Sequence, residues 1–218
     1  MGLSSINNLP LQLSVYIVWF SIILQHIKNI LTELINMSNT NDQFDEAIAS
    51  CKDIFINKTK DYGTSWRVLR TISIVDQIFI KALRIRNIQD MKTQKVGDSI
   101  GSEFKGILNY AVIGMIQLEL ENPRVEEVEV PIVNKWYDQY VACAKSVMTD
   151  KNHDYGEAWR EMSQESFADL ILVKLLRIKQ ILSNDGKTII SEGIDSNYVD
   201  ILNYAAFALI LIEEENNK

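Results

Sequence analysis

The chain has 218 residues, of which 47% are hydrophobic and 23% charged, with three prolines and nine glycines. This composition excludes a disordered chain and disfavours a turn-rich β-sandwich, so we expect long helices. The formal net charge of −7 argues against direct nucleic-acid binding, which needs clustered Lys and Arg, but a local basic pocket for a small anion stays compatible with it.

Residues 1–36 contain a strongly apolar run, 11–24, that predicts an N-terminal helix. The run ends at Gln25, His26 and Lys28, short of the roughly 20 apolar residues that span a membrane. No positive side chain precedes it, as a secretory signal would require. Three interpretations stay open: a helix packed on the protein, an extension upstream of a start at Met37, and, as a minor alternative, a membrane anchor. We expect a cytoplasmic protein that does not act on membranes.

The remainder of the chain contains one sequence written twice. KTKDYGTSWR, at 58–67, recurs as KNHDYGEAWR at 151–160, and the offset from Asp61 to Asp154 is 93 residues. After one inserted residue, ILNYA at 107–111 recurs at 201–205. Such self-similarity indicates a tandem duplication. We predict a first repeat over 37–122, a linker over 123–136 and a second repeat over 137–218.

Each repeat is predicted to contain three helices. The linker carries Pro123, Pro131 and alternating Val and Glu, which favour an extended segment. One three-helix unit is too small to bury its apolar faces well alone. We therefore expect an all-α fold in which both copies pack as a pseudo-symmetric bundle, plus the N-terminal apolar helix. The expected helices cover 44–57, 73–90 and 103–121, then 137–149, 167–183 and 198–215, and the first of each trio ends before a loop with Asp-Tyr-Gly.

Cysteine and histidine offer little chemistry here. Cys51 and Cys143 lie in the first predicted helix of their repeats without CxxC spacing, so we interpret both as small core residues in a reducing compartment. His26 and His153 occupy non-equivalent positions, which leaves no material for a zinc site of the His/Cys type.

The second predicted helix of each repeat carries a duplicated polar arc. A turn of 100° per residue places its apolar side chains on one side and the repeated polar ones opposite. Neighbouring exposed positions differ between the copies, as Arg70 and Ser163 show, whereas the polar set is kept. We therefore interpret the arc as functional rather than merely solvated. Its members are Ser73, Asp76, Lys81 and Arg84, matched by Ser166, Asp169, Lys174 and Arg177.

Further polar and aromatic residues are duplicated around this arc. Glycine can end a helix and the rings can cover the core, but neither role explains why a lysine and an aspartate accompany them. A buried amide needs a hydrogen-bond partner, which a nucleobase edge or a fixed carboxylate would provide. The set comprises Lys58, Asp61, Tyr62, Gly63, Trp66, Asn109 and Tyr110, matched by Lys151, Asp154, Tyr155, Gly156, Trp159, Asn203 and Tyr204.

Carboxylates are distributed unequally between the repeats. In the second repeat Glu161, Glu165 and Asp169 follow one another turn by turn, and Asp200 precedes the Asn-Tyr pair. The first repeat offers only Asp76 and Glu103. Cations, carboxylates and rings together suit a nucleotide whose phosphates are bridged by Mg²⁺. We predict these six carboxylates as metal ligands, and Asp169, Glu165, Asp200 and Asp76 as catalytic, with the second repeat richer.

These residues carry a resemblance to a known family. The pattern K-x-x-D-Y-G-x-x-W, then S-x-x-D-x-x-x-x-K-x-x-R, then an acidic residue before N-Y resembles the nucleotide-modification-associated domain family, long catalogued as a domain of unknown function. The resemblance covers Phe44 to Asn122 and Tyr137 to Asn216. That family is similar in helical layout to the MazG-like all-α nucleoside triphosphate pyrophosphatases, whose E-x-x-E and E-x-x-D helices hold Mg²⁺. Neither repeat here has a clean E-x-x-E.

The resemblance implies a Mg²⁺-dependent nucleoside triphosphate pyrophosphohydrolase-like enzyme acting on an NTP or dNTP. Lys81, Arg84, Lys174 and Arg177 would grip the phosphates while carboxylates hold the metal. One alternative is a non-catalytic nucleotide-binding or interaction module that keeps the pocket without the full metal set. Another is a structural salt-bridge network between the repeats. The sequence is compatible with a homo-oligomer and does not specify one.

Overall fold

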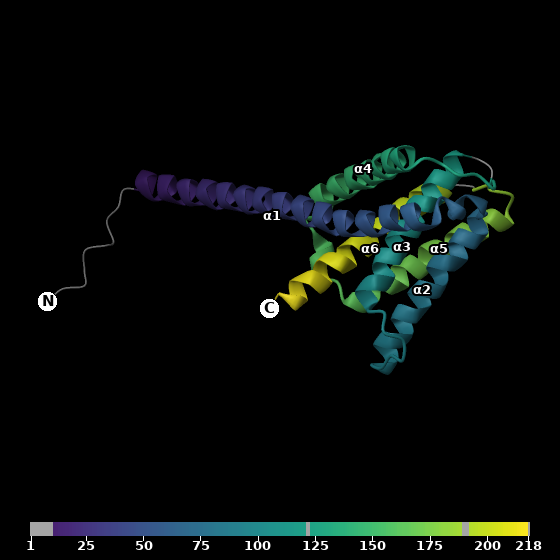
Figure 1. The fold of residues 1–218 in the computed structure, drawn as a ribbon. Helices are drawn as coiled ribbons and strands as arrows, with labels where there is room; N and C mark the ends of the chain where they lie inside the picture. The colour runs from purple at the N-terminus through teal and green to yellow at the C-terminus, as the bar shows by residue number, and fades with distance from the viewer. Residues whose placement is uncertain (1–10, 121–122, 189–191, 218) are drawn as a thin grey trace. The chain divides into compact units, whose positions relative to one another are not determined.

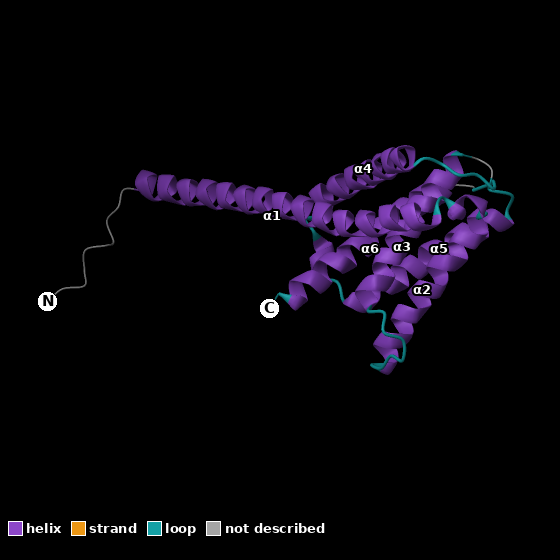
Figure 2. Cartoon of the chain, viewed as in Figure 1, coloured by secondary structure: helices purple, strands orange, loops and turns teal. Residues whose placement is uncertain are grey.

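The structure is a computed structural model that describes residues 11–120, 123–188 and 192–217, with side chains outside 11–17 and 29–38 (Figure 1). Within these residues all regular structure is helical and no strand occurs, so the all-α prediction is confirmed (Figure 2). Two short 3₁₀ turns, η1 (Ser65–Val68) and η2 (Ala158–Glu161), accompany the α-helices. These are α1 (Leu11–Tyr62), α2 (Thr71–Met91), α3 (Ile100–Glu119), α4 (Val130–Tyr155), α5 (Gln164–Ser183) and α6 (Ile194–Asn216).

The first helix of each repeat is longer than predicted. Both α1 and α4 continue through the Asp-Tyr pair, because no helix-breaking residue precedes the glycine that follows it. Gly63 and Gly156 then adopt φ of 65° and 61°, the left-handed conformation that commonly ends a helix. α4 also begins early, at Val130, since Pro131 in the first turn needs no hydrogen bond from its nitrogen. The extended linker is therefore confined to about 123–129.

The chain divides into two compact units, residues 1–40 and 41–218. In the first unit, the predicted apolar helix is confirmed from Leu11 onward, and residues 1–10 lie outside the description. The side chains of residues 18–28 are all exposed, among them Trp19 and Phe20. None of the helices that the structure describes is both long enough and apolar enough to cross a membrane.

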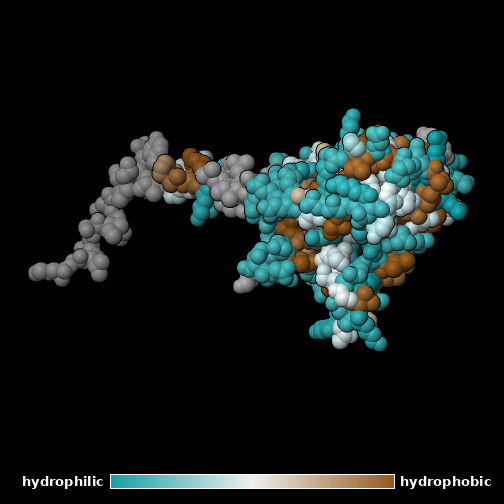
Figure 3. All heavy atoms as spheres, in the orientation of Figure 1, coloured by the Kyte–Doolittle hydropathy of each residue, from teal (hydrophilic) through white to brown (hydrophobic). Residues whose placement is uncertain are grey.

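The second unit, residues 41–218, contains both repeats around one core. α3 packs against α6 and α2 against α5, so each of these contacts joins the two repeats. α3 and α6 are buried over most of their surfaces. Cys51 belongs to this core, whereas Cys143 is exposed, so the core prediction was wrong for Cys143. The face of the unit seen in Figure 3 is mostly hydrophilic, with scattered hydrophobic side chains.

Reciprocal ion pairs show that the repeats are related by a pseudo-two-fold axis. Lys52 on α1 binds Asp138 on α4 at 2.6 Å, and Lys145 on α4 binds Asp45 on α1 at 2.6 Å. The repeat offset of 93 converts the first pair into the second. An interface in which each residue meets its partner's counterpart is what a two-fold axis produces. The predicted pseudo-symmetric bundle is thus present in the second unit.

Candidate functional site

A cleft of about 660 Å³ in the first repeat gathers most of the residues predicted there. The end of α1, η1, α2 and α3 form its walls. We call it the first-repeat cleft. The predicted residues that line it are Lys58, Tyr62, Gly63, Trp66, Lys81, Glu103, Asn109 and Tyr110. Lys105, Gly106, Gln77 and Asp98 also line it and were missed, because comparison of the repeats passes over positions that differ, such as Lys105 against Val199.

Glu103 pairs with Lys81, which lines this cleft, and with Arg84, which lies outside it. Its carboxylate is 94% buried and accepts a hydrogen bond from Lys81 Nζ at 3.0 Å and another from Arg84. Arg84 also donates to the carbonyls of Val96 at 3.2 Å and Asp98 at 2.9 Å. Its guanidinium therefore fastens the loop between α2 and α3, and Arg84 is not among the residues that line the cleft.

Other polar groups of the cleft are left without protein partners. Among the described residues, neither Lys58 nor Lys105 forms an ion pair. The buried Nε1 of Trp66 has no hydrogen-bond partner there either. Tyr62 is 71% exposed at the edge of the cleft. An ammonium group without a counter-ion and an accessible ring are groups that can bind an anionic aromatic ligand.

The side-chain nitrogen of each buried asparagine has a hydrogen-bond partner within the protein. Asn109 Nδ2 donates to the carbonyl of Cys51 at 3.0 Å, and Asn203 Nδ2 donates to the equivalent carbonyl of Ala144 at 3.1 Å. Each amide therefore ties the third helix of its repeat to the first. The partner is backbone rather than the nucleobase edge or carboxylate that we expected, so these residues are mainly structural.

In the second repeat, the duplicated lysines Lys151 and Lys174 pair with one carboxylate of the same repeat. Asp200 is 95% buried, and its carboxylate accepts Lys151 Nζ at 2.7 Å on one oxygen and Lys174 Nζ on the other. Burial acts to lower the pKa of Lys151, but its hydrogen bond to Asp200 and the attraction of that carboxylate outweigh burial, and the pKa is raised. Lys151 and Asp200 line a cavity of about 500 Å³ together with Cys143.

The structure does not gather the other predicted residues of the second repeat into this cavity. Trp159 stacks on Phe207 with ring centroids 4.3 Å apart. The side chain of Asn203 donates its hydrogen bond to the backbone of α4. Tyr204 is half-buried, and burial, then Asp200, raise the pKa of its hydroxyl. The residues that face solvent instead are Asp154, Tyr155, Glu161, Glu165, Asp169 and Arg177, beside an open Gly156. The expectation that the second repeat is richer is therefore reversed.

Two of the predicted catalytic aspartates, Asp76 and Asp169, lie where α2 meets α5. Asp76 binds Lys179 of the other repeat at 2.7 Å, and Asp169 binds Arg86 at 3.6 Å, a second reciprocal set. Their retention in both copies thus has a structural cause, as the salt-bridge alternative supposed. Among the described residues no three His, Cys, Asp or Glu side chains are grouped to hold a metal ion. With Glu103 and Asp200 also committed to cations, this donor set does not fit Mg²⁺.

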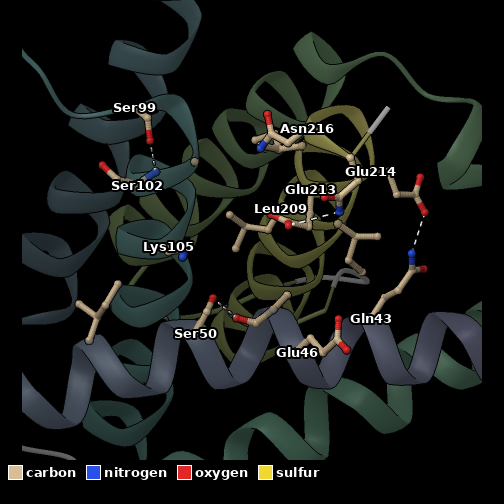
Figure 4. A pocket seen from close by; sticks show the side chains of 16 residues that line it. Gln43, Glu46, Ser50, Ser99, Ser102, Lys105, Leu209, Glu213, Glu214 and Asn216 are labelled. Atoms are coloured by element: carbon tan, nitrogen blue, oxygen red, sulfur yellow. Dashed lines mark hydrogen bonds between the residues drawn. The ribbon is translucent and has the colours of Figure 1, made fainter.

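A second cavity of about 610 Å³ adjoins the first-repeat cleft (Figure 4). The two share Ile54, Ser102 and Lys105, so Lys105 stands at their junction. The far side of this cavity carries Glu214, which accepts a hydrogen bond from Gln43 at 2.7 Å. Lys105 is therefore reachable from both cavities.

The fold and the cleft define an all-helical, internally duplicated domain with a cationic cleft in one repeat. The chain belongs to the nucleotide modification associated domain 1 family, whose model matches residues 58–118 and 151–212. The two matches confirm the resemblance and the tandem duplication. Comparison with curated proteins gives no match. Comparison with solved structures gives none either.

Proposed function

We propose that the chain binds a nucleotide, or a chemically similar phosphorylated ligand, in the first-repeat cleft. The observation that carries this proposal is the surplus of unpaired cations: Lys58 and Lys105 line the cleft without a counter-ion. In a protein with a net charge of −7, such a local surplus attracts an anion that the rest of the surface repels. The description of the family supports a role connected with nucleotides.

The cleft offers separate groups for the parts of a nucleotide. Lys58 and Lys105 would neutralise phosphate oxygens, because ammonium groups make strong charge-assisted hydrogen bonds to them. The exposed ring of Tyr62 would stack on the base. The volume of about 660 Å³ is in the range of small-molecule sites.

Hydrolysis stays a separate prediction. The relation to MazG-like pyrophosphatases and the use of Mg²⁺ are implied by the resemblance alone. Four of the six carboxylates that would hold the metal, Glu103, Asp169, Asp200 and Asp76, are paired with Lys or Arg in the described residues. The other two, Glu161 and Glu165, face solvent. We therefore propose binding and derive no chemical step through a metal.

Isothermal titration calorimetry with ribo- and deoxyribonucleoside triphosphates, at low and high salt, tests the proposal. We expect binding that weakens with salt, as exposed charge pairs do. Lys58→Ala and Lys105→Ala should each weaken binding about tenfold, or roughly 1.4 kcal/mol. Lys135→Ala removes an equal charge from an exposed site outside the cleft and is the matched control. Equal affinities for all three variants and the wild type would refute the location.

A pyrophosphate-release assay on the same protein, with and without Mg²⁺, separates binding from turnover. Release that needs Mg²⁺ would favour the enzyme implied by the resemblance. Binding without release would favour the non-catalytic module. Neither result alters the prediction for the lysine variants.

A further inference from the structure

The two repeats differ at one position beside the conserved lysines. The offset that aligns Asn109 with Asn203 also aligns Gly106 with Asp200. Lys58 and Lys81 of the first repeat correspond to Lys151 and Lys174 of the second. Both copies thus keep the same two ammonium groups, but only the second places a carboxylate side chain between them.

In the second repeat this carboxylate satisfies both cations. Asp200 receives Lys151 at 2.7 Å and Lys174 through its other oxygen, and its side chain is only 7% exposed. Lys174 itself is 91% buried. Buried charges of this kind persist only when they are paired, so the carboxylate and the lysines stabilise one another.

In the first repeat the corresponding place has no side chain. A Cβ added to Gly106 would lie 2.9 Å from Cε and 3.1 Å from Nζ of Lys81, so this lysine passes directly over the glycine. Lys81 binds Glu103, one helical turn earlier, where the second repeat has Asn197. Lys58 has no ion pair among the described residues. The end of the Lys81 side chain lies beside Gly106, so a ligand that reaches this place contacts Lys81 and meets no carboxylate at position 106.

We infer that a phosphate group of the ligand binds beside Gly106 in the first repeat. It takes the place that the Asp200 carboxylate occupies in the second repeat. This inference rests on the proposed function, because it names where the ligand's phosphate sits and which side chains hold it. The phosphate contacts Lys58 and Lys81, as the Asp200 carboxylate contacts Lys151 and Lys174. The chain consequently binds one phosphorylated ligand, and the residue at positions 106 and 200 decides which repeat binds it.

Exchanging the two residues tests the inference, with inorganic pyrophosphate as the probe in calorimetry. Gly106→Asp supplies the missing carboxylate and should weaken pyrophosphate binding at least tenfold. Gly106→Ala adds only a Cβ, which meets the flexible end of Lys81, and it should retain most of the affinity. Equal losses for Asp and Ala would attribute the effect to the displacement of Lys81 instead of the carboxylate and would overturn the inference.

The reverse exchange should create a site. Asp200→Gly removes the internal anion, so the number of pyrophosphate ions bound per chain should rise from one to two. Asp200→Asn keeps the shape of the core and is the second variant in case the glycine variant folds poorly. For both, the melting temperature should fall in buffer without multivalent anions and recover when pyrophosphate is added, by more than the wild type gains.

The outcomes separate the inference from the function on which it rests. A wild-type protein that binds no pyrophosphate and no nucleotide overturns the proposed function. A wild type that binds, combined with Asp200 variants that gain neither a second ion nor extra stabilisation by pyrophosphate, overturns the inference. A second ion that is lost again in Asp200→Gly combined with Lys151→Ala supports it.

Discussion

The hydroxyl of Tyr137 in the second repeat donates a hydrogen bond of 2.9 Å to Oδ1 of Asn109 in the first repeat. Both polar atoms of the Asn109 amide thereby have a partner, since its nitrogen donates to Cys51. The equivalent oxygen of Asn203 has no partner in the described residues, and the position equivalent to Tyr137 is Phe44, which has no hydroxyl. The hydrogen bond from Tyr137 thus distinguishes Asn109 from Asn203, whose side chains otherwise make equivalent contacts.

Tyr137→Phe should destabilise the protein by about 1–3 kcal/mol, because it leaves a buried amide oxygen without a donor. Denaturant unfolding of the variant measures this loss. Tyr140→Phe is the control, since the hydroxyl of Tyr140 donates to Glu119 at an exposed position where water can replace it. Similar losses in both variants would show that the bond to Asn109 has no special weight.

Gly114→Ala should also destabilise the protein, by about 1–3 kcal/mol through overpacking. Gly114 lies on α3 against the buried ring of Tyr198 on α6, and an added Cβ would approach Cζ of that ring to 2.5 Å. Thermal unfolding of this variant is compared with that of Gly97→Ala. At Gly97 no atom lies within 4 Å of an added Cβ, so the control should unfold like the wild type.

Asp169→Asn should leave nucleotide binding unchanged. The carboxylate is 58% exposed and its contact with Arg86 is 3.6 Å long, so the pair contributes at most about 1 kcal/mol to stability. Calorimetric titration and denaturant unfolding of the same preparation check both statements. A tenfold loss of affinity would return Asp169 to the binding site.

The two cysteines should differ sharply in reactivity. An aromatic disulfide such as dithiobis(nitrobenzoate) should form a mixed disulfide with the exposed Cys143 in the native protein, releasing thionitrobenzoate, and should reach the buried Cys51 only after unfolding. Stoichiometry before and after adding denaturant measures the difference, and Cys143→Ala identifies the residue. Rapid modification of two thiols in the native state would contradict the burial of Cys51.

Burial raises the pKa of the Cys51 thiol to about 12. In the unfolded chain the thiol loses its proton near its ordinary value, close to 9, whereas the folded protein keeps it. The folded form is therefore favoured by this group below pH 9, and the contribution is lost as the pH rises toward 12. Cys51→Ala should flatten the decline of unfolding free energy between pH 9 and 10.5, compared with the wild type.

The helices were predictable because their apolar positions recur at helical spacing and because the duplication provides an internal check. The ends of the helices were less predictable. Nothing in the residues before Gly63 stops a helix, and Pro131 suits a first turn as well as an extended linker. Cys143 was placed in the core because it lies in a predicted helix without CxxC spacing, but its equivalent is Ser50, a hint that this position lies outside the core.

The site was predicted in part. Repetition correctly marked Lys58, Trp66 and Lys81 as neighbours, because all three line one cleft. It also marked Asp169, whose retention reflects an ion pair between repeats. Comparing copies cannot separate residues kept for a ligand from residues kept for pseudo-symmetry. It also passes over the position at which the repeats differ, where Gly106 of the first repeat corresponds to Asp200 of the second.

The linker connects the two repeats, which pack against each other through α2 with α5 and α3 with α6. Val125 within it is 97% exposed, whereas the backbone of Arg124 beside it donates to Arg67 at 2.8 Å. The molecule thus resembles a heterodimer whose subunits are tethered, with the tether raising their effective concentration. Split between Val125 and Glu126 and co-expressed, the two fragments should reassemble, whereas either fragment alone would expose half of a shared core.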